Sequence, residues 1–367
     1  MQAIDRGRRF VVANPFAGLL AGIAILLLAD LIWSLFMGTL PFSRLATYTW
    51  DGLVVGLVIG LASVGLSMTY SILNFANFAH GDYITAGAFM GWSVTFLVAG
   101  VFRNQPIDGL LLVGAGGEVY ASDLGINVLQ TPLAVVLGLI AAIGATILVV
   151  LAIDRIAFRP LREEEGIILL ITSVGVALAL RYSIVFIYQQ STRSVTANVP
   201  SVAVPMIDGT LNVTIHQITL VVVAAILMLG VHVFLQSTKL GKAMRAMADN
   251  KDLARVTGIP TERVVRWTWI IGGGLTGAAG YLIALERGTL SFNLGWLLLL
   301  LIFAAVILGG IGSIYGAIAG GIVIGLASRV SLIWLPEATF ARPVAFLVMI
   351  FLLVYRPQGI FGGRTTA

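Results

Sequence analysis

The hydrophobic positions of this chain form long continuous runs rather than an alternating pattern, with short polar stretches between them. The runs cover residues 16–37, 50–73, 82–102, 131–153, 167–188, 215–236, 267–286, 296–309, 314–334 and 343–355. Most are far longer than a barrel strand and have the length of a helix that crosses a membrane, while the shortest fit half-spans. The pattern predicts an all-α polytopic membrane protein with about ten spans or half-spans.

Composition narrows the class of protein further. Of the 367 residues, 59% are hydrophobic and 11% are charged, and the mean hydropathy is +1.00, which is typical of a membrane helix bundle. The chain has no cysteine, which excludes disulfides and thiolate metal sites, and its three histidines form no metal constellation. We expect no metal and no cofactor. The net charge of +5 is better explained by membrane topology than by nucleic-acid binding.

The basic residues predict which side of the membrane each loop occupies. With the N-terminus inside, segments 1–15, 154–166, 237–266 and 356–367 hold 15 of the 22 lysines and arginines, as the positive-inside rule requires. The predicted organisation is a cytoplasmic N-terminus (1–15), a transmembrane domain (16–355) with a cytoplasmic loop at 237–266, and a cytoplasmic tail (356–367). We expect the first run to be a retained helix, because it is long, contains Asp30 and lacks a clear signal-peptide cleavage site.

The loop 237–266 carries signals for an ordered elbow. Asn250 is placed to cap a short helix over 251–257, Gly258 ends that helix, and Thr261 is placed to cap the next one. The nearby apolar side chains of Leu253, Val256 and Ile259 have no evident lipid or core to pack against. This favours a docking surface over a solvated loop whose charges only set topology. The residues expected to make the contact are Asn250, Lys251, Leu253, Ala254, Arg255, Gly258 and Ile259.

A polar stretch, "LNFANFAHGDY" (73–83), interrupts one of the most apolar regions. If it is helical, Asn74, Asn77 and His80 share one face. Gly81 then permits a sharp bend, and Asp82 is placed to cap the following helix. Two interpretations are open, and both can hold: these side chains satisfy backbone groups freed by the bend, or they line a translocation path.

Two further features are candidates for the same path. The stretch "GGIGS" (309–313) separates two apolar runs, and Gly309, Gly310, Gly312 and Ser313 form either a tight turn or the end of a half-helix. Arg181 lies within a span, where it snorkels, forms a structural ion pair or meets the carboxylate of a passing solute.

The remaining polar positions predict little chemistry. We expect Asp30, the one embedded carboxylate that the pattern identifies, to pair with a polar neighbour or another subunit. His216 and His232 are expected at the membrane interface. The external segment 189–214 is rich in Ser, Thr, Val and Pro and predicts extended or hairpin structure.

Four motifs in this order resemble the LivH-type permease family of branched-chain amino acid ABC importers: "LNFANFAHGDY", "GKAMRAMADNKDLARVTGI" (241–259), "LGGIGSIYGAIAGG" (308–321) and "YRPQGIFG" (355–362). They span roughly residues 50–362. The resemblance implies a second permease subunit, two ATP-binding subunits and an extracytoplasmic solute-binding protein as partners. It also implies a prokaryotic cytoplasmic (inner) membrane, and it assigns 241–259 to coupling with the ATPase.

The sequence agrees with this division of labour, because no G-x-x-x-x-G-K-[ST] phosphate loop occurs in it. We therefore expect no enzyme activity from this chain and predict the permease subunit of an ATP-driven importer for branched-chain or similar hydrophobic amino acids. Three alternatives stay open. They are the same machine carrying urea, short amides or other small organic solutes, a stand-alone channel or ion-coupled secondary transporter, and, more remotely, an intramembrane enzyme.

Overall fold

The computed structural model describes residues 15–110, 119–335 and 337–361. Of the predicted terminal segments, 1–15 lies outside this range except for Pro15, and the tail is described as far as Phe361. The α-helices are α2 (Pro15–Phe36), α3 (Phe42–Leu73), α4 (His80–Phe102), α5 (Ala121–Leu124), α6 (Pro132–Ile153), α7 (Gly166–Tyr188), α8 (Ile215–Ser237), α9 (Lys239–Asp249), α10 (Lys251–Val256), α11 (Thr261–Arg287), α12 (Leu294–Gly309), α13 (Ile314–Val330) and α14 (Ala341–Tyr355).

Short irregular helices and strands complete the described chain. They are the 3-10 turns η1 (Ile107–Gly109), η3 (Arg159–Leu161), η4 (Ser331–Ile333) and η5 (Ala338–Phe340), the π-helix η2 (Asp154–Phe158), and the strands β1 (Arg193–Ser194), β2 (Ser201–Met206), β3 (Gly209–Thr214) and β4 (Thr289–Leu290). Strand β2 pairs antiparallel with β3, and β1 with β4. The hairpin β2–β3 confirms the extended structure expected at 189–214.

Ten apolar helices correspond to the ten predicted runs. Seven helices in the described residues are long and apolar enough to cross a membrane, and three shorter ones accompany them at 21–36, Leu294–Gly309 and Ala341–Tyr355. The all-α, multi-pass fold is therefore confirmed. Two helices begin more than a turn before the predicted run: α3 starts at Phe42 rather than residue 50, and α11 starts at Thr261 rather than residue 267.

The bundle is organised around three deeply buried helices, α3, α4 and α11, with α6, α12 and α13 against them. Helices α3 and α13 cross at glycines that are spaced four residues apart on each helix. A Cβ at Gly321 would lie 2.4 Å from the backbone nitrogen of Gly60, and one at Gly325 would lie 2.4 Å from that of Gly56. Only glycine permits this approach, which brings two backbones into direct contact as small residues do in membrane helix pairs.

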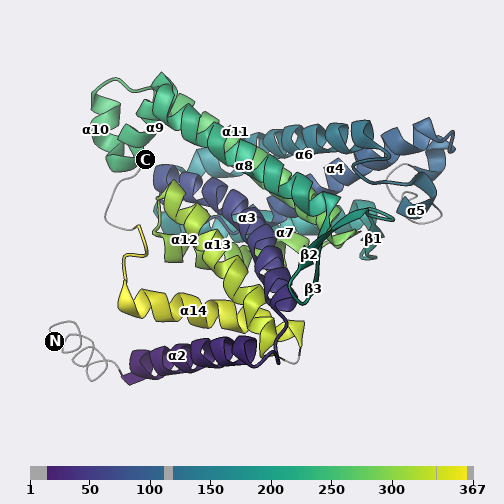
Figure 1. Cartoon of the computed structure of the whole chain (residues 1–367). Coiled ribbons are helices and arrows are strands. Elements are labelled where there is room, and N and C mark those ends of the chain that lie inside the picture. Colours follow the sequence, from purple (N-terminus) through teal and green to yellow (C-terminus); the bar gives the residue numbers. More distant parts are fainter. Residues whose placement is uncertain (1–14, 111–118, 336, 362–367) are drawn as a thin grey trace.

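The polar elements lie at opposite ends of the bundle (Figure 1). Helices α9 and α10 form the elbow at one end, while α5 and the β2–β3 hairpin lie at the other. Helix α2 lies at the edge of the bundle, where it packs against α14 (Figure 1). On α2, Asp30 accepts a hydrogen bond from the Trp334 indole (2.8 Å), so it has the polar neighbour that the sequence predicted.

Candidate functional site

The break between α3 and α4 is made by Asn74 and not by Gly81. Asn74 ends α3 in the left-handed conformation (φ 55°), and its N–H donates to the carbonyl of Tyr70 (2.8 Å). Asparagine tolerates the left-handed conformation better than most residues because its short side-chain amide can hydrogen-bond to nearby backbone groups. Residues 74–79 are not helical, so the condition under which Asn74, Asn77 and His80 would share one helical face is not met. Gly81 lies in the first turn of α4, where a Cβ would come within 2.9 Å of the Gly295 carbonyl on α12.

Within the break, Asn77 is fully buried. Its Oδ1 accepts a hydrogen bond from the Ala79 N–H (3.1 Å), whereas its Nδ2 has no hydrogen-bond partner within the described part of the chain. The next residue, Phe78, donates its backbone N–H to Ser173 Oγ on α7 (3.0 Å). Side chains thus replace the missing helical hydrogen bonds, and one amide group is left over for another partner.

His80 is a packing residue at a three-helix crossing. Its Nε2 lies 2.9 Å from the carbonyl of Ala62 on α3 and 3.2 Å from Thr276 Oγ1 on α11. The ring is buried, and its contacts link α4, which carries His80, to α3 and α11.

Asp82 forms an ion pair inside the bundle and does not cap α4, which begins two residues earlier at His80. Arg181 of α7 donates from Nε and Nη2 to the two carboxylate oxygens of Asp82 (3.0 and 2.9 Å). The guanidinium also lies over the ring of Trp296 on α12, 4.5 Å from its centroid. Of the three roles open for Arg181, the structure shows the structural ion pair, in the bidentate geometry that arginine favours.

The glycine-rich turn between α12 and α13 is tightly packed. Gly310 and Gly312 have positive φ (103° and 85°), and Ser313 caps α13 by accepting a hydrogen bond from the Gly316 N–H (3.0 Å). A Cβ at Gly309 would lie 2.0 Å from the Gly316 carbonyl. The C-terminal segment covers this turn, because the N–H groups of 360 and 361 donate to the carbonyls of 308 and 309 (2.8 and 3.0 Å). Two sequence motifs nearly fifty residues apart therefore form one structural unit.

The elbow has the caps that the sequence predicted, with two exceptions. Asn250 Oδ1 accepts a hydrogen bond from the Leu253 N–H (2.9 Å), and Gly258 follows α10 with φ 85°. Thr261 does not cap α11, which has Pro260 at that position. Ile259 packs against the core and is not left without a partner.

The outer face of α10 is the exposed apolar surface of the elbow. Leu253 is 61% exposed and Val256 is 85% exposed, while Ala254 is buried against the bundle. Lys251 and Arg255 lie on the same short helix. A helix of six residues presents this surface rigidly because both of its ends are fixed.

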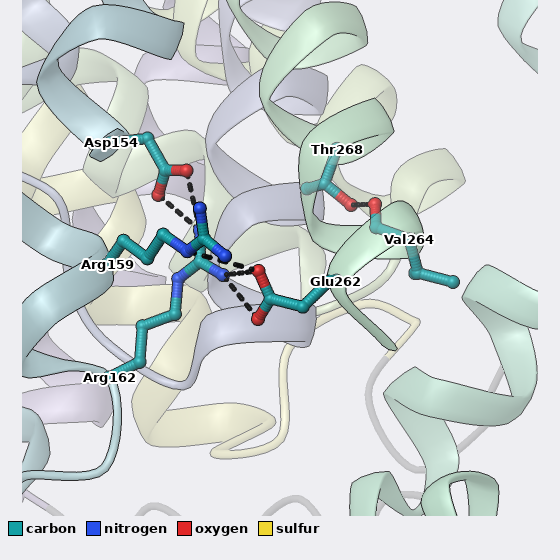
Figure 2. A network of polar contacts seen from close by, with 6 residues as sticks. All are labelled: Asp154, Arg159, Arg162, Glu262, Val264 and Thr268. Atoms are coloured by element: carbon teal, nitrogen blue, oxygen red, sulfur yellow. Dashed lines mark hydrogen bonds and ion pairs between the residues drawn. The ribbon is translucent and has the colours of Figure 1, made fainter. Parts of the chain in front are cut away.

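An ionic network joins the elbow to the end of α6 (Figure 2). Arg162 donates from Nη2 to both oxygens of Asp154 (2.6 and 2.5 Å) and from Nη1 to both oxygens of Glu262 (2.8 and 2.9 Å). Arg159 approaches Glu262 at 3.6 Å. Glu262 lies in the first turn of α11, directly after the elbow, and Thr268 bonds back to the Val264 carbonyl in the next turn (3.0 Å). We call Asp154, Arg162 and Glu262 the arginine clip.

Aromatic packing extends from the clip to the break. Phe158, at the end of the π-helix η2, stacks on Trp269 of α11 (centroids 5.5 Å apart, 10° between planes) and contacts Phe75 of the break (5.3 Å). A π-helical turn inside a helix is often found at functional sites. The sequence analysis missed both the clip and this stack. The signal available was the spacing of Arg155, Arg159 and Arg162, which follows one helical face.

The structure places more carboxylates within helices than the sequence pattern identified. Asp51, Asp82 and Glu286 lie within helices, so Asp30 is not the single embedded carboxylate. Asp51 accepts a hydrogen bond from the Gln217 amide (3.0 Å). His216, the second residue of α8, is buried in the bundle, and its Nδ1 lies 3.1 Å from the Leu285 carbonyl; its position at the membrane interface stays a prediction. The described residues contain no group of three or more potential metal ligands.

Comparisons with known proteins identify relatives along most of the chain. A family model described as branched-chain amino acid transport system / permease component matches residues 48–353. The high-affinity branched-chain amino acid transport system permease protein LivH of Escherichia coli K12 is 29% identical over 328 residues, covering 85% of this chain and 94% of its own length. BraD of Pseudomonas aeruginosa is 28% identical with the same coverage, and a probable LivH of Methanocaldococcus jannaschii is 28% identical over 82% of this chain and 88% of its own. No solved structure matches.

Proposed function

The chain belongs to the branched-chain amino acid transport system permease family, and we propose that it is the membrane-spanning subunit of an ATP-driven importer for branched-chain or similar hydrophobic amino acids. The family match over 48–353 is the observation that carries the proposal. The proposed partners are a second homologous permease, two ATP-binding subunits and an extracytoplasmic solute-binding protein. The proposed location is a prokaryotic cytoplasmic membrane, with both termini and the elbow inside.

The elbow is the proposed contact with an ATP-binding subunit. The argument rests on Leu253 and Val256, which a water-facing helix would otherwise leave exposed without benefit. Asn250 and Gly258 stabilise the two ends of α10. Movement of an ATP-binding subunit against α10 would therefore displace the whole helix instead of unwinding its ends. The seven elbow residues predicted from the sequence retain this role as a proposal.

Motion of the elbow reaches the break through a continuous series of contacts. The elbow leads directly into α11, whose first turn carries Glu262 of the arginine clip. The clip holds the π-helix η2, and Phe158 at its end packs on Phe75. This places the non-helical segment 74–79 at the far end of the series, and we assign to it the change in shape that opens the path.

The proposed path runs beside the break. The argument for Asn77 is its buried amide Nδ2, which makes no direct hydrogen bond in the described residues although the amide lies close to the equally buried Tyr83 hydroxyl. His80, Asp82 and Arg181 are proposed to shape the wall by holding the helices together, and Asn74 by ending α3 at the start of the break. Gly309, Gly310, Gly312 and Ser313 form the proposed second wall at the α12–α13 turn.

Uptake by reconstituted vesicles tests the function. The chain is reconstituted with its permease and ATP-binding partners, and the solute-binding protein is added outside. Uptake of labelled leucine, isoleucine or valine should require ATP inside the vesicles and the binding protein outside. Uptake by the chain alone, driven by a proton or sodium gradient, would favour the secondary transporter and overturn the proposal. Uptake of urea or short amides in place of leucine would leave the ATP-driven importer in place and change the assigned substrate.

A further inference from the structure

A polar pocket of about 580 Å³ opens beside the arginine clip, at the end of the bundle that carries the elbow. Six charged side chains line it, and Figure 2 shows four of them, Asp154, Arg159, Arg162 and Glu262. The other two are Arg155 on the π-helix and Arg266 on α11. The pocket therefore combines charged groups from two segments about a hundred residues apart.

The charges of this pocket are not balanced within the chain. Four arginines face two carboxylates, and Arg162 occupies both carboxylates through four hydrogen bonds. Arg155 and Arg266 have no ion pair in the described residues. Two guanidinium groups are thus available at the pocket, and guanidinium is the side-chain group best matched to a phosphate.

One wall of the pocket is apolar. Leu151 and Ala152 belong to the last turn of α6, where Leu151 is half-buried against the core and Ala152 is exposed, and Ile156, which is 77% exposed, follows in the π-helix. Helix α6 is long and apolar enough to cross a membrane, and the charged residues begin at Asp154, directly after it, so we expect them near the lipid headgroups. The pocket joins arginines to an apolar rim, which would face the acyl chains at that depth.

We propose that this pocket binds the phosphate headgroup of an anionic lipid, with Arg155 and Arg266 as its ligands and the apolar rim against an acyl chain. Basic pockets between helices at the cytoplasmic leaflet suit such headgroups. A free phosphate would pair with the arginines but would make no contact with the apolar rim. The bound lipid would neutralise the cations around the clip and so hold the start of α11 against α6.

A lipid titration tests the site on the purified full-length chain in a non-ionic detergent. Native mass spectrometry counts bound dioleoylphosphatidylglycerol, dioleoylphosphatidylcholine and inorganic phosphate in separate arms. The variants are Arg155→Gln and Arg266→Gln, which leave the clip intact. The matched control is Arg263→Gln, an exposed arginine on the same helix that does not line the pocket. Thermal unfolding confirms that all variants remain folded.

Phosphatidylglycerol should bind more tightly than phosphatidylcholine. Each pocket variant should weaken it about fivefold, from roughly 1 kcal/mol per basic group at an anionic surface, while Arg263→Gln should change it less than twofold. Equal binding of both lipids, or equal losses in Arg263→Gln and Arg266→Gln, would overturn the proposal. Inorganic phosphate binding as tightly as the lipid would overturn the lipid assignment. Because no arm measures transport, the result is independent of the proposed function.

Discussion

The Asp82–Arg181 ion pair should be a major attachment of α7 to the bundle. Most of the α7 surface faces outward, and its polar inner contacts are the Asp82 pair, Ser173 and, at its far end, Tyr188, which bonds to Ser93 and packs on Phe89 of α4. Asp82 is fully buried and Arg181 is 14% exposed. Removing one member of a buried pair costs about 3–5 kcal/mol, because the remaining charge is left without compensation. We therefore expect Arg181→Met to lose about that much unfolding free energy.

Asp82→Ala should cost less than Arg181→Met. The remaining arginine has a long side chain that can redirect its charge toward the membrane surface, whereas a buried carboxylate cannot. The double variant Asp82→Ala/Arg181→Met removes both charges and should be more stable than Arg181→Met alone. Tyr182→Phe, an exposed neighbour on α7, is the control and should stay within about 0.5 kcal/mol of the parent.

Equilibrium unfolding of the parent and the four variants in mixed detergent micelles measures these differences, and uptake per inserted protein is measured beside it. The reasoning fails if Arg181→Met is as stable as the control, or if the losses of the two single variants simply add in the double variant. Additive losses would mean that the two side chains do not interact.

Three other predictions concern the elbow, the break and the hairpin. Leu253→Pro removes the backbone N–H that donates to Asn250 Oδ1 in the first turn of α10, which costs about 1 kcal/mol as the loss of an N-cap does, and it also removes an exposed apolar side chain from the docking surface. ATP-dependent uptake should fall in protein that still inserts; normal uptake would make the elbow a topological anchor. Asn77→Ala should lower stability by roughly 1–3 kcal/mol if the amide only repairs the break. Altered cargo preference at unchanged stability would instead indicate a path residue. Backbone N–H donors of Ser43 and Phe42 lower the pKa of Asp208, so the stabilisation is present above about pH 4 and is lost as the pH falls through the folded-state pKa. A spin label at Ile207→Cys should gain mobility over that range, and Asp208→Asn should be mobile at all pH values.

The features of this protein that depend only on residues close together in the sequence were predicted from the sequence. The thickness of the hydrocarbon core fixes the length of an apolar run, so the number and rough positions of the spans were predicted correctly. Capping is equally local, since Asn250 needs only the N–H three residues ahead, and this cap was also predicted. The membrane-facing and core-facing sides of α6 or α7 were not predicted, because in lipid both sides are apolar and the helical periodicity that separates them in water is weak.

Tertiary structure alone decided which polar groups meet. Arg162 bonds to Glu262, 100 residues along the chain, and Asp82 to Arg181, 99 residues along. Each of these side chains, read alone, was a loop charge, a cap or a snorkelling group. In an interior without water, a buried charge is stable only beside its partner, so the packing of the helices selects the pairs. The sequence indicated where polar groups interrupt the apolar runs, but only the fold determined which group satisfies which.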